Sequence, residues 1–95
     1  MYANVVTMRY KNREDVEKGV EKLKPLVDML PSNPGFQSFI LVRTGEKETM
    51  NVVTFATEEN AKTARERMLP KVKEAVGGFL VSEPEARTSE ILASK

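Results

Sequence analysis

The 95-residue sequence contains no cysteine, no histidine and no tryptophan. Without cysteine, the chain can form neither a disulfide framework nor a thiolate metal site nor a redox dithiol. Without histidine, it lacks the side chain that most readily exchanges protons near neutral pH and most often ligates metals. These absences exclude many common catalytic chemistries, and we expect neither a metal site nor a bound cofactor.

A surplus of one charge and a long apolar run are also missing. The 15 Lys and Arg residues nearly balance the 14 Asp and Glu residues, whereas binding to nucleic acid or anionic lipid requires a clustered positive surplus. No stretch reaches the roughly 18 apolar residues of a membrane span, and the first residues, "MYANVVTMRY", do not resemble an export signal. We therefore expect a cytoplasmic protein whose partner is neither nucleic acid nor a membrane.

The length predicts a single domain, residues 1–95, with a modest core. A chain of this size buries only about 60 to 65% of the surface that its unfolded form exposes. Oligomerisation would add buried surface and so would stabilise such a domain.

Four segments have the residue types of β-strands. Residues 2–10 are rich in β-branched and aromatic side chains. Residues 36–44 and 48–56 are two further runs joined by a short connection at Gly45, which predicts a β-hairpin. A weaker alternation within residues 79–95 predicts a last strand, whose limits the pattern leaves open.

Two segments between these strands have helical periodicity. Residues 16–30 carry apolar side chains at spacings of three and four, and Asn12 is the predicted N-cap. Residues 58–76 repeat the pattern, with Thr57 as the predicted N-cap and Gly77 as the stop.

A proline lies inside each predicted helix. Proline has no backbone N–H for the helical hydrogen bond, and its ring crowds the preceding turn. We therefore expect Pro25 to kink or divide the first helix, and Pro70 to break the second near Leu69.

The element order βαββαβ predicts an α+β, ferredoxin-like subunit, an antiparallel sheet with two helices on one face. Residues 36–44 and 48–56 are apolar on both alternating faces, whereas a strand with one wet face alternates between apolar and polar residues. Because the helices cover only one face, we expect a second copy of the sheet to cover the other. The sequence therefore predicts a homodimer.

Three segments resemble the antibiotic biosynthesis monooxygenase family: "ANVVTMRY", "NPGFQSFILVRT" and "ETMNVVTFATEENAK", with amphipathic helices after the first and the third. The likeness covers residues 1 to about 80, and the "PGF" and "FATEENAK" motifs carry most of it. It implies a homodimer that forms a dimeric α+β barrel, with a cavity between sheet and helices in each subunit. Several members oxygenate quinols or polyketide phenols without metal or flavin.

One branch of similar proteins, the haem-degrading monooxygenases, carries an asparagine early in the first strand, where Asn4 stands here. That branch also uses a tryptophan and an axial histidine on the second helix, and Arg65 and Ala75 lie near those two positions. Without histidine, Tyr2, Tyr10 or a methionine would have to ligate the iron. Haem binding is therefore the third alternative for this chain.

Asn4 is the candidate catalytic residue. An amide on a strand that is buried on both faces must find hydrogen-bond partners, and a ligand carbonyl or phenolate would be one. The alternative is that Asn4 satisfies neighbouring backbone groups. Arg9 and Arg43 are candidates for holding an anionic substrate, although arginines at strand ends usually pair with Glu or lie in solvent.

Apolar and aromatic residues supply the candidate ligand-binding wall. Some share the face of Asn4 by strand alternation, and others lie on the next two strands. The candidates are Tyr2, Val6, Met8, Phe39 and Phe55. An apolar wall with few polar groups suits a small aromatic ligand. The alternative is that these side chains form the core or the rim of an interface.

Two functions stay open beside haem binding. The first is a cofactor-independent monooxygenase of the antibiotic biosynthesis type, acting on a small quinol-like or polyphenolic compound. Such a substrate ionises and gives an electron to oxygen, so the protein need only bind it, stabilise the anion and exclude water. No carboxylate falls at a predicted interior position of the first three strands, so proton loss would depend on the substrate's own acidity. The second is a non-catalytic homodimeric module that binds a small ligand.

Overall fold

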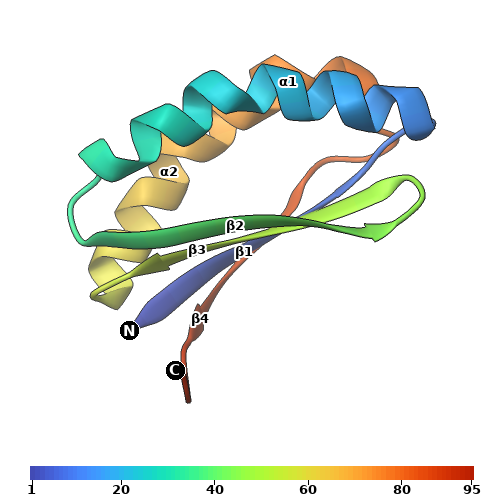
Figure 1. Ribbon diagram of the computed structural model, residues 1–95. Helices are drawn as coiled ribbons and strands as arrows, with labels where there is room; N and C mark the ends of the chain where they lie inside the picture. Colours follow the sequence, from blue (N-terminus) through green and yellow to red (C-terminus); the bar gives the residue numbers. More distant parts are fainter.

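The computed structural model describes residues 1–95 as a four-stranded antiparallel sheet with two helices on one face (Figure 1). The strands are β1 (Tyr2–Arg9), β2 (Phe36–Gly45), β3 (Glu48–Phe55) and β4 (Glu85–Glu90). The helices are α1 (Arg13–Met29) and α2 (Glu58–Val76), followed by the short 3-10 turns η1 (Leu30–Ser32) and η2 (Gly77–Phe79). The strand order β2-β3-β1-β4 and the chain order βαββαβ confirm the predicted ferredoxin-like fold. Neither helix is long and apolar enough to cross a membrane.

Both helices begin at the predicted caps. The Asn12 side chain accepts a hydrogen bond of 2.8 Å from the backbone N–H of Asp15, and the Thr57 hydroxyl accepts one of 3.1 Å from Asn60. Each cap satisfies one of the first four N–H groups, which have no partner within the helix. The second helix ends at Val76, directly before Gly77, as predicted.

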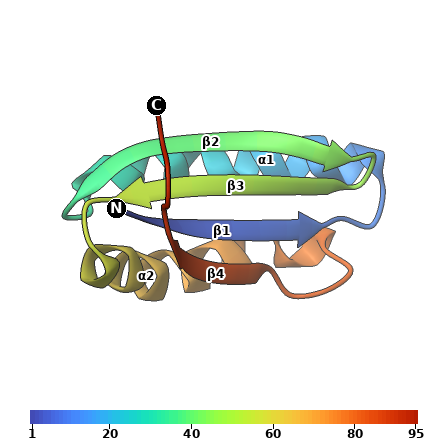
Figure 2. The same cartoon turned by 90° about the horizontal axis from the view of Figure 1, so that it is seen from below.

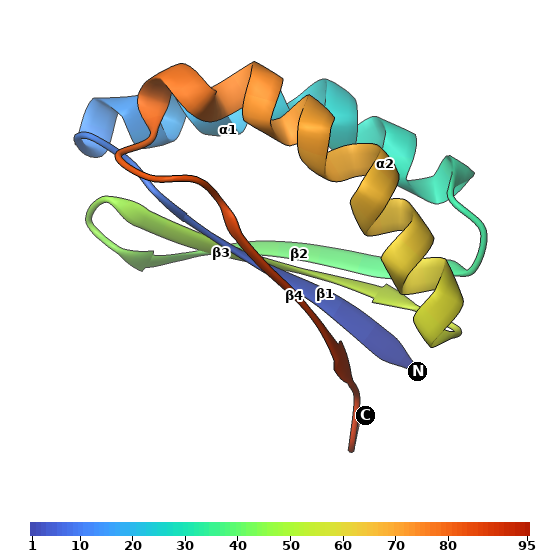
Figure 3. The same ribbon diagram turned by 180° about the vertical axis from the view of Figure 1, so that it is seen from behind.

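The two prolines do not divide the helices, contrary to our prediction for Pro70. Both α1 and α2 continue through their prolines. Pro70 and Glu66, whose carbonyl loses its partner, are both solvent-exposed, as are Pro25 and Glu21. Water can therefore satisfy the freed carbonyls, and the helix tolerates the proline as a bend. Figure 3 shows α2 changing direction along its length.

The "PGF" motif is a tight turn that leads into β2. Gly35 has φ of +77°, a conformation that side chains of L-residues disfavour. A Cβ at Gly35 would also clash with the Asn60 side chain at the start of α2. The Gly35 carbonyl accepts a hydrogen bond of 2.9 Å from the N–H of Ala56, just after β3. The motif therefore holds the entry of β2 against the passage from β3 to α2.

The core between sheet and helices consists of two clusters. The first contains the buried residues Met8, Tyr10, Val16, Leu23, Val76 and Leu80. The second contains Leu30, Val53, Phe55, Ala61, Ala64 and Met68. In the first cluster, the Tyr10 ring lies so close to Gly19 that a Cβ there would come within 2.5 Å of Tyr10 Cε2. The helices are thus fixed to the sheet at two separate places.

No helix covers the opposite face of the sheet (Figure 2), and this face carries apolar side chains. Ile40 and Val42 of β2 are 57% and 41% exposed. Their cross-strand neighbours on β3 are Val52 and Met50. The second apolar face that the sequence of these two strands predicted is therefore not covered by any part of this chain. This surface, which contains Ile40, Val42, Met50 and Val52, is called here the open sheet face.

Candidate functional site

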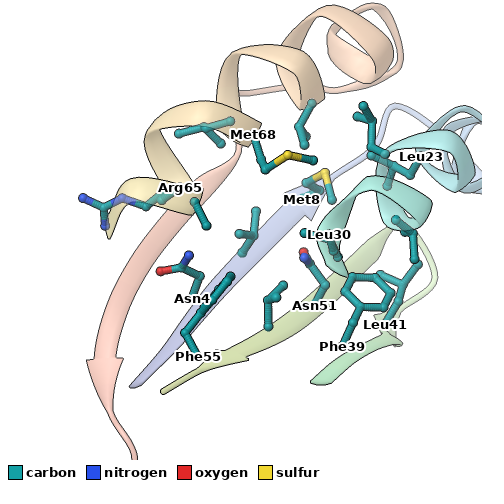
Figure 4. A pocket seen from close by; sticks show the side chains of 17 residues that line it. Asn4, Met8, Leu23, Leu30, Phe39, Leu41, Asn51, Phe55, Arg65 and Met68 are labelled. Carbon is teal, nitrogen blue, oxygen red and sulfur yellow. The ribbon is translucent and has the colours of Figure 1, made fainter. Parts of the chain in front are cut away.

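A pocket lies between the sheet and the two helices, and residues of both core clusters line it (Figure 4). Its volume is about 70 Å³, it is partly open to solvent, and 14 of its 17 lining residues are hydrophobic. The only polar side chains in the lining are Asn4, Asn51 and Arg65. A mostly apolar concavity with a few polar groups has the character of a small-molecule site.

Five of the six predicted site residues come together in this pocket: Asn4, Val6, Met8, Phe39 and Phe55. Strand alternation was the signal that placed the first three on one face. Tyr2 does not line the pocket but packs against the second core cluster. Tyr2 is the first residue of β1 and pairs with Phe55 and Glu90 at the end of the sheet.

Asn4 is buried, with 5% of its surface exposed, and two hydrogen bonds hold its carboxamide. Its Nδ2 donates to the carbonyl of Ala61 in α2 at 2.8 Å, and its Oδ1 accepts from the Thr88 hydroxyl of β4 at 2.7 Å. Asn4 therefore joins β1 to two elements that are distant in sequence, rather than to neighbouring backbone. A carboxamide has two N–H donors and two acceptor lone pairs, so one of each remains for a ligand.

Neither arginine considered for anion binding reaches the pocket. Arg9 pairs with Glu85 at 2.7 Å and with Glu48 at 3.1 Å on the surface, and the hydrogen bond to Glu85 raises the pKa of Arg9 further. Arg43 donates to the exposed carbonyl of Glu46 at 2.8 Å. Both side chains have the solvated, paired role that strand-end arginines usually have.

Arg65 of α2 is a pocket residue that the strand-based analysis did not include among its candidates. It forms no ion pair, and Figure 4 shows its guanidinium directed away from the cavity while its stem lies along the wall. The sequence signal that could have identified Arg65 is its helical spacing, because it stands four residues after Ala61 and three before Met68. Arg65 therefore brings a positive charge without an acidic partner to the edge of the pocket.

Asn51 of β3 is the second pocket residue that the sequence analysis missed. It stands two residues before Val53 and four before Phe55, so strand alternation directs all three toward the helices. The same alternation that found Asn4 would have found it.

The pocket offers little to a haem. Of the two residues near the positions that the resemblance assigns to the tryptophan and the histidine, Arg65 lines the pocket, and Ala75 packs against the first core cluster and brings no ligand. The volume of about 70 Å³ is below the roughly 150 Å³ of an apolar cavity that takes a single benzene ring. Of the iron ligands that the sequence left open, neither tyrosine lines the pocket, and only Met8 and Met68 do. A porphyrin has four pyrrole rings, so the third alternative stays a prediction that would need a much wider pocket.

No protein-family model matches the sequence, and no curated protein matches it. Solved structures match the fold over nearly the whole chain. A Nitrosomonas europaea protein assigned to the antibiotic biosynthesis monooxygenases has a TM-score of 0.80 at 14% identity, covering 98% of this chain and 100% of that one. SnoaB, a cofactor-independent oxygenase from Streptomyces nogalater, gives 0.76 at 12% identity, covering 98% and 94%.

A third similar structure, a dimeric ferredoxin-like protein from an uncultured marine organism, gives a TM-score of 0.77 at 13% identity, covering 99% of this chain and 90% of that one. At such identities the likeness establishes the fold alone. This chain therefore has the subunit fold of these proteins, which confirms the ferredoxin-like subunit that the sequence predicted.

Proposed function

We propose that this protein is a cofactor-independent monooxygenase that acts on a small, single-ring quinol-like compound. The observation that carries the proposal is the apolar pocket into which Asn4 is fixed by two hydrogen bonds. The likeness in fold to a cofactor-independent oxygenase supports it. A shared fold does not by itself imply shared chemistry, so the pocket residues have to account for the reaction.

The reaction needs no reductant because the quinol supplies all the electrons. One quinol and one O₂ give one hydroxyquinone and one water, so one oxygen atom enters the ring and the other leaves as water. The first step is loss of a proton from the quinol, since the anion gives an electron to oxygen more readily. The protein has to bind the ring, stabilise the anion and exclude water.

Asn4 and Arg65 are the residues for stabilising the anion. The two hydrogen bonds of Asn4 fix the direction of its free amide hydrogen, so it would donate to a developing oxyanion without reorganising. The guanidinium of Arg65 has no acidic partner and stands on a flexible stem at the pocket edge. A rotation of that stem would bring its charge toward a bound phenolate.

The pocket favours a single ring over a polycyclic phenol. Its volume of about 70 Å³ is below the roughly 150 Å³ of a cavity that takes one benzene ring, so a single ring needs some rearrangement of the wall and a fused ring system needs more. Met8 and Met68 line it, and methionine side chains rearrange easily because they are unbranched and flexible. The pocket can therefore widen to accept one ring, and the partly open mouth leaves substituents in solvent.

We also propose that the protein works as a homodimer, with the open sheet face covered by a second copy. The likeness in fold to a dimeric ferredoxin-like protein supports this assembly. The homodimer serves equally the second candidate function, a non-catalytic module that binds a small ligand, and only activity separates the two.

Oxygen uptake tests the proposal. The purified protein is mixed with substituted hydroquinones and with polycyclic phenols, in the presence of a metal chelator, and compared with boiled protein. We expect uptake above the boiled control for single-ring quinols, with one O₂ consumed per product formed. Binding of the quinols without any uptake would move the function to the ligand-binding module.

Two variants show whether Asn4 acts in the reaction. Asn4→Ala removes the donor, and we expect turnover to fall by about 100-fold, as when one oxyanion donor is lost. Thr88→Val keeps the carboxamide and removes only one of the bonds that hold it, so we expect a much smaller loss. Unchanged turnover in Asn4→Ala would remove Asn4 from the mechanism.

A further inference from the structure

Asn51 places a carboxamide in the middle of the pocket floor. It belongs to the central part of β3, where it pairs with Val6 of β1 and Leu41 of β2, and both neighbours also line the pocket. Figure 4 shows its side chain directed from the strand into the cavity, toward the side of Leu30 and Met8. The other polar side chains of the lining are Asn4 and Arg65, and the hydrogen bonds of Asn4 go to Ala61 and Thr88 rather than to Asn51.

The Asn51 side chain lacks the partners that Asn4 has. Its Oδ1 is completely buried and accepts no hydrogen bond. Buried Oδ1 of Asn33 and Oγ1 of Thr49 are also without partners, but neither of these residues lines the pocket. A buried polar atom without a partner destabilises the fold, and native proteins keep few of them. Of the three residues with an unpaired buried polar atom, Asn51 is therefore the one that lines the pocket.

The chemistry of the Asn51 carboxamide indicates which ligand group can form its missing hydrogen bond. The oxygen and nitrogen of an asparagine side chain can exchange places by a half turn, so the group offers either an acceptor or a donor to the cavity. A hydroxyl both donates and accepts, and it therefore pairs with Asn51 in either orientation. A carbonyl or an ether oxygen only accepts, and would leave Oδ1 unpaired.

We propose that Asn51 is the residue that binds a hydroxyl group of a single aromatic ring in this pocket. The proposal deepens the proposed function and rests on it, because it requires that the pocket holds a small aromatic compound. Asn51 then sets the specificity for phenols, and Asn4 and Arg65 receive the charge that develops on the other side of the ring. The pocket rejects a ring without a hydroxyl because that ring would leave the buried carboxamide unpaired.

The test compares phenol with fluorobenzene, which has nearly the same shape but no hydrogen-bond donor. Both are titrated into wild-type and Asn51→Leu protein, and the dissociation constants are measured from amide chemical shifts by NMR. The measured quantity is the dissociation constant of fluorobenzene divided by that of phenol. We expect this ratio to fall about tenfold in Asn51→Leu, the value of one buried hydrogen bond.

Leu41→Met is the matched control, since Leu41 faces Asn51 across the strand pair and lines the same pocket. It alters the shape of the wall slightly and leaves the polar group in place, so the ratio should not change. Asn51→Ala replaces Asn51→Leu if that variant does not fold.

Two outcomes would contradict the proposal. If both rings bind and the ratio is the same in wild-type protein and in the Asn51 variants, Asn51 does not recognise the hydroxyl, and the proposed function of the pocket still stands. If neither ring shifts the amides of pocket residues, the proposed function fails and the role of Asn51 fails with it.

Thermal unfolding of the free protein supplies a second readout. A ligand-binding Asn51 is an unpaired group in the free protein, so Asn51→Leu should raise the melting temperature. A purely structural Asn51 would need its carboxamide for folding, and Asn51→Leu would lower it. A lowered melting temperature together with an unchanged ratio would assign Asn51 to the fold.

Discussion

Asn4 and Asn51 carry the same side chain on neighbouring strands and face the same pocket, but their carboxamides have different surroundings. Asn4 is tied to Ala61 and Thr88, whereas the oxygen of Asn51 has no partner. The difference comes from α2 and β4, which reach the position of Asn4. At the scale of single residues, strand alternation thus places both asparagines at the pocket. The neighbours that the fold brings to each carboxamide determine whether its hydrogen bonds are formed.

This difference predicts unequal effects on stability. Asn4→Ala would leave the Ala61 carbonyl and the Thr88 hydroxyl without their partner, so we expect the free energy of unfolding to fall by about 1 to 3 kcal/mol. Asn51→Ala leaves no group unpaired and should cost less. Urea denaturation of both variants checks this, and equal losses would contradict the assignment of the two roles.

Gly19 is the second residue whose role depends on a neighbour from another element. Gly19→Ala would push a methyl group into the buried ring of Tyr10 at 2.5 Å, and we expect it to lower the free energy of unfolding by about 1 to 3 kcal/mol. Gly77→Ala is the control, because a Cβ there meets nothing within 4 Å and the backbone is already helical. It should stabilise by about 0.4 to 1 kcal/mol. Thermal unfolding distinguishes the two signs, and a neutral Gly19→Ala would show that the ring of Tyr10 can move.

The pocket lining also predicts the pH dependence of turnover. The lining contains no Asp, Glu, Lys or Tyr, and the chain has no His or Cys. The pocket therefore offers none of the side chains that usually act as a general base. We expect turnover to rise with pH up to the pKa of the substrate, and the midpoint to move with the substrate when quinols of different acidity are compared. A midpoint that is the same for all quinols would reveal a general base in the protein.

At the scale of elements, α2 shows how tertiary packing changes the effect of a residue that disfavours a helix. Pro70 removes a helical hydrogen bond, yet α2 continues from Glu58 to Val76. The stripe of Ala61, Ala64, Met68 and Val76 packs against the core on both sides of the proline. Burial of this stripe holds the two halves together, so tertiary packing overrides a residue that would end an isolated helix.

Restoring the missing bond should therefore stabilise α2 without lengthening it. In Pro70→Ala the residue regains an N–H for the carbonyl of Glu66, and we expect a gain of about 1 to 2 kcal/mol in the free energy of unfolding. The helical circular dichroism signal should stay nearly the same, because the helix is already continuous. Pro31→Ala, in the 3-10 turn after α1, serves as the control. A loss of stability in Pro70→Ala would mean that the bend itself is needed for packing.

At the scale of the whole molecule, the sheet has one face packed against the helices and one open face. The open sheet face exposes Ile40 at 57% and Val42 at 41%, beside Val52 and Met50 on the next strand. Contiguous apolar residues on a surface mark a site of association. A second copy offers the same face, so a symmetric contact would cover both.

The predicted dimer is tested by light scattering at micromolar concentration. The wild-type protein should have the mass of a dimer, and Ile40→Lys should shift it toward the monomer because the contact would bury an unpaired charge. Val81→Lys is the control, since Val81 is 62% exposed and lies outside the sheet. A monomeric wild-type protein would remove the proposed homodimer.

The sequence alone allowed the elements, their caps and their order to be predicted, because these depend on local chemistry. Period-two and helical patterns, Asn12 and Thr57 as caps, and the turn at Gly45 all act within a few residues of their position. The grouping of Asn4, Val6 and Met8 in one pocket also followed from alternation. Tyr2 was misplaced because alternation gives the face of a strand and not the position along the sheet.

Tertiary structure decided what the residues of the pocket contact. The bonds of Asn4 to Ala61 and Thr88 join residues that are 57 and 84 positions apart, and no local pattern encodes such a pairing. The approach of Arg65 to the pocket edge and the unpaired oxygen of Asn51 likewise depend on how α2 and the strands pack. Local chemistry therefore determined which elements form and which faces are apolar. The packing of distant elements determined which polar groups are satisfied and which remain for a ligand.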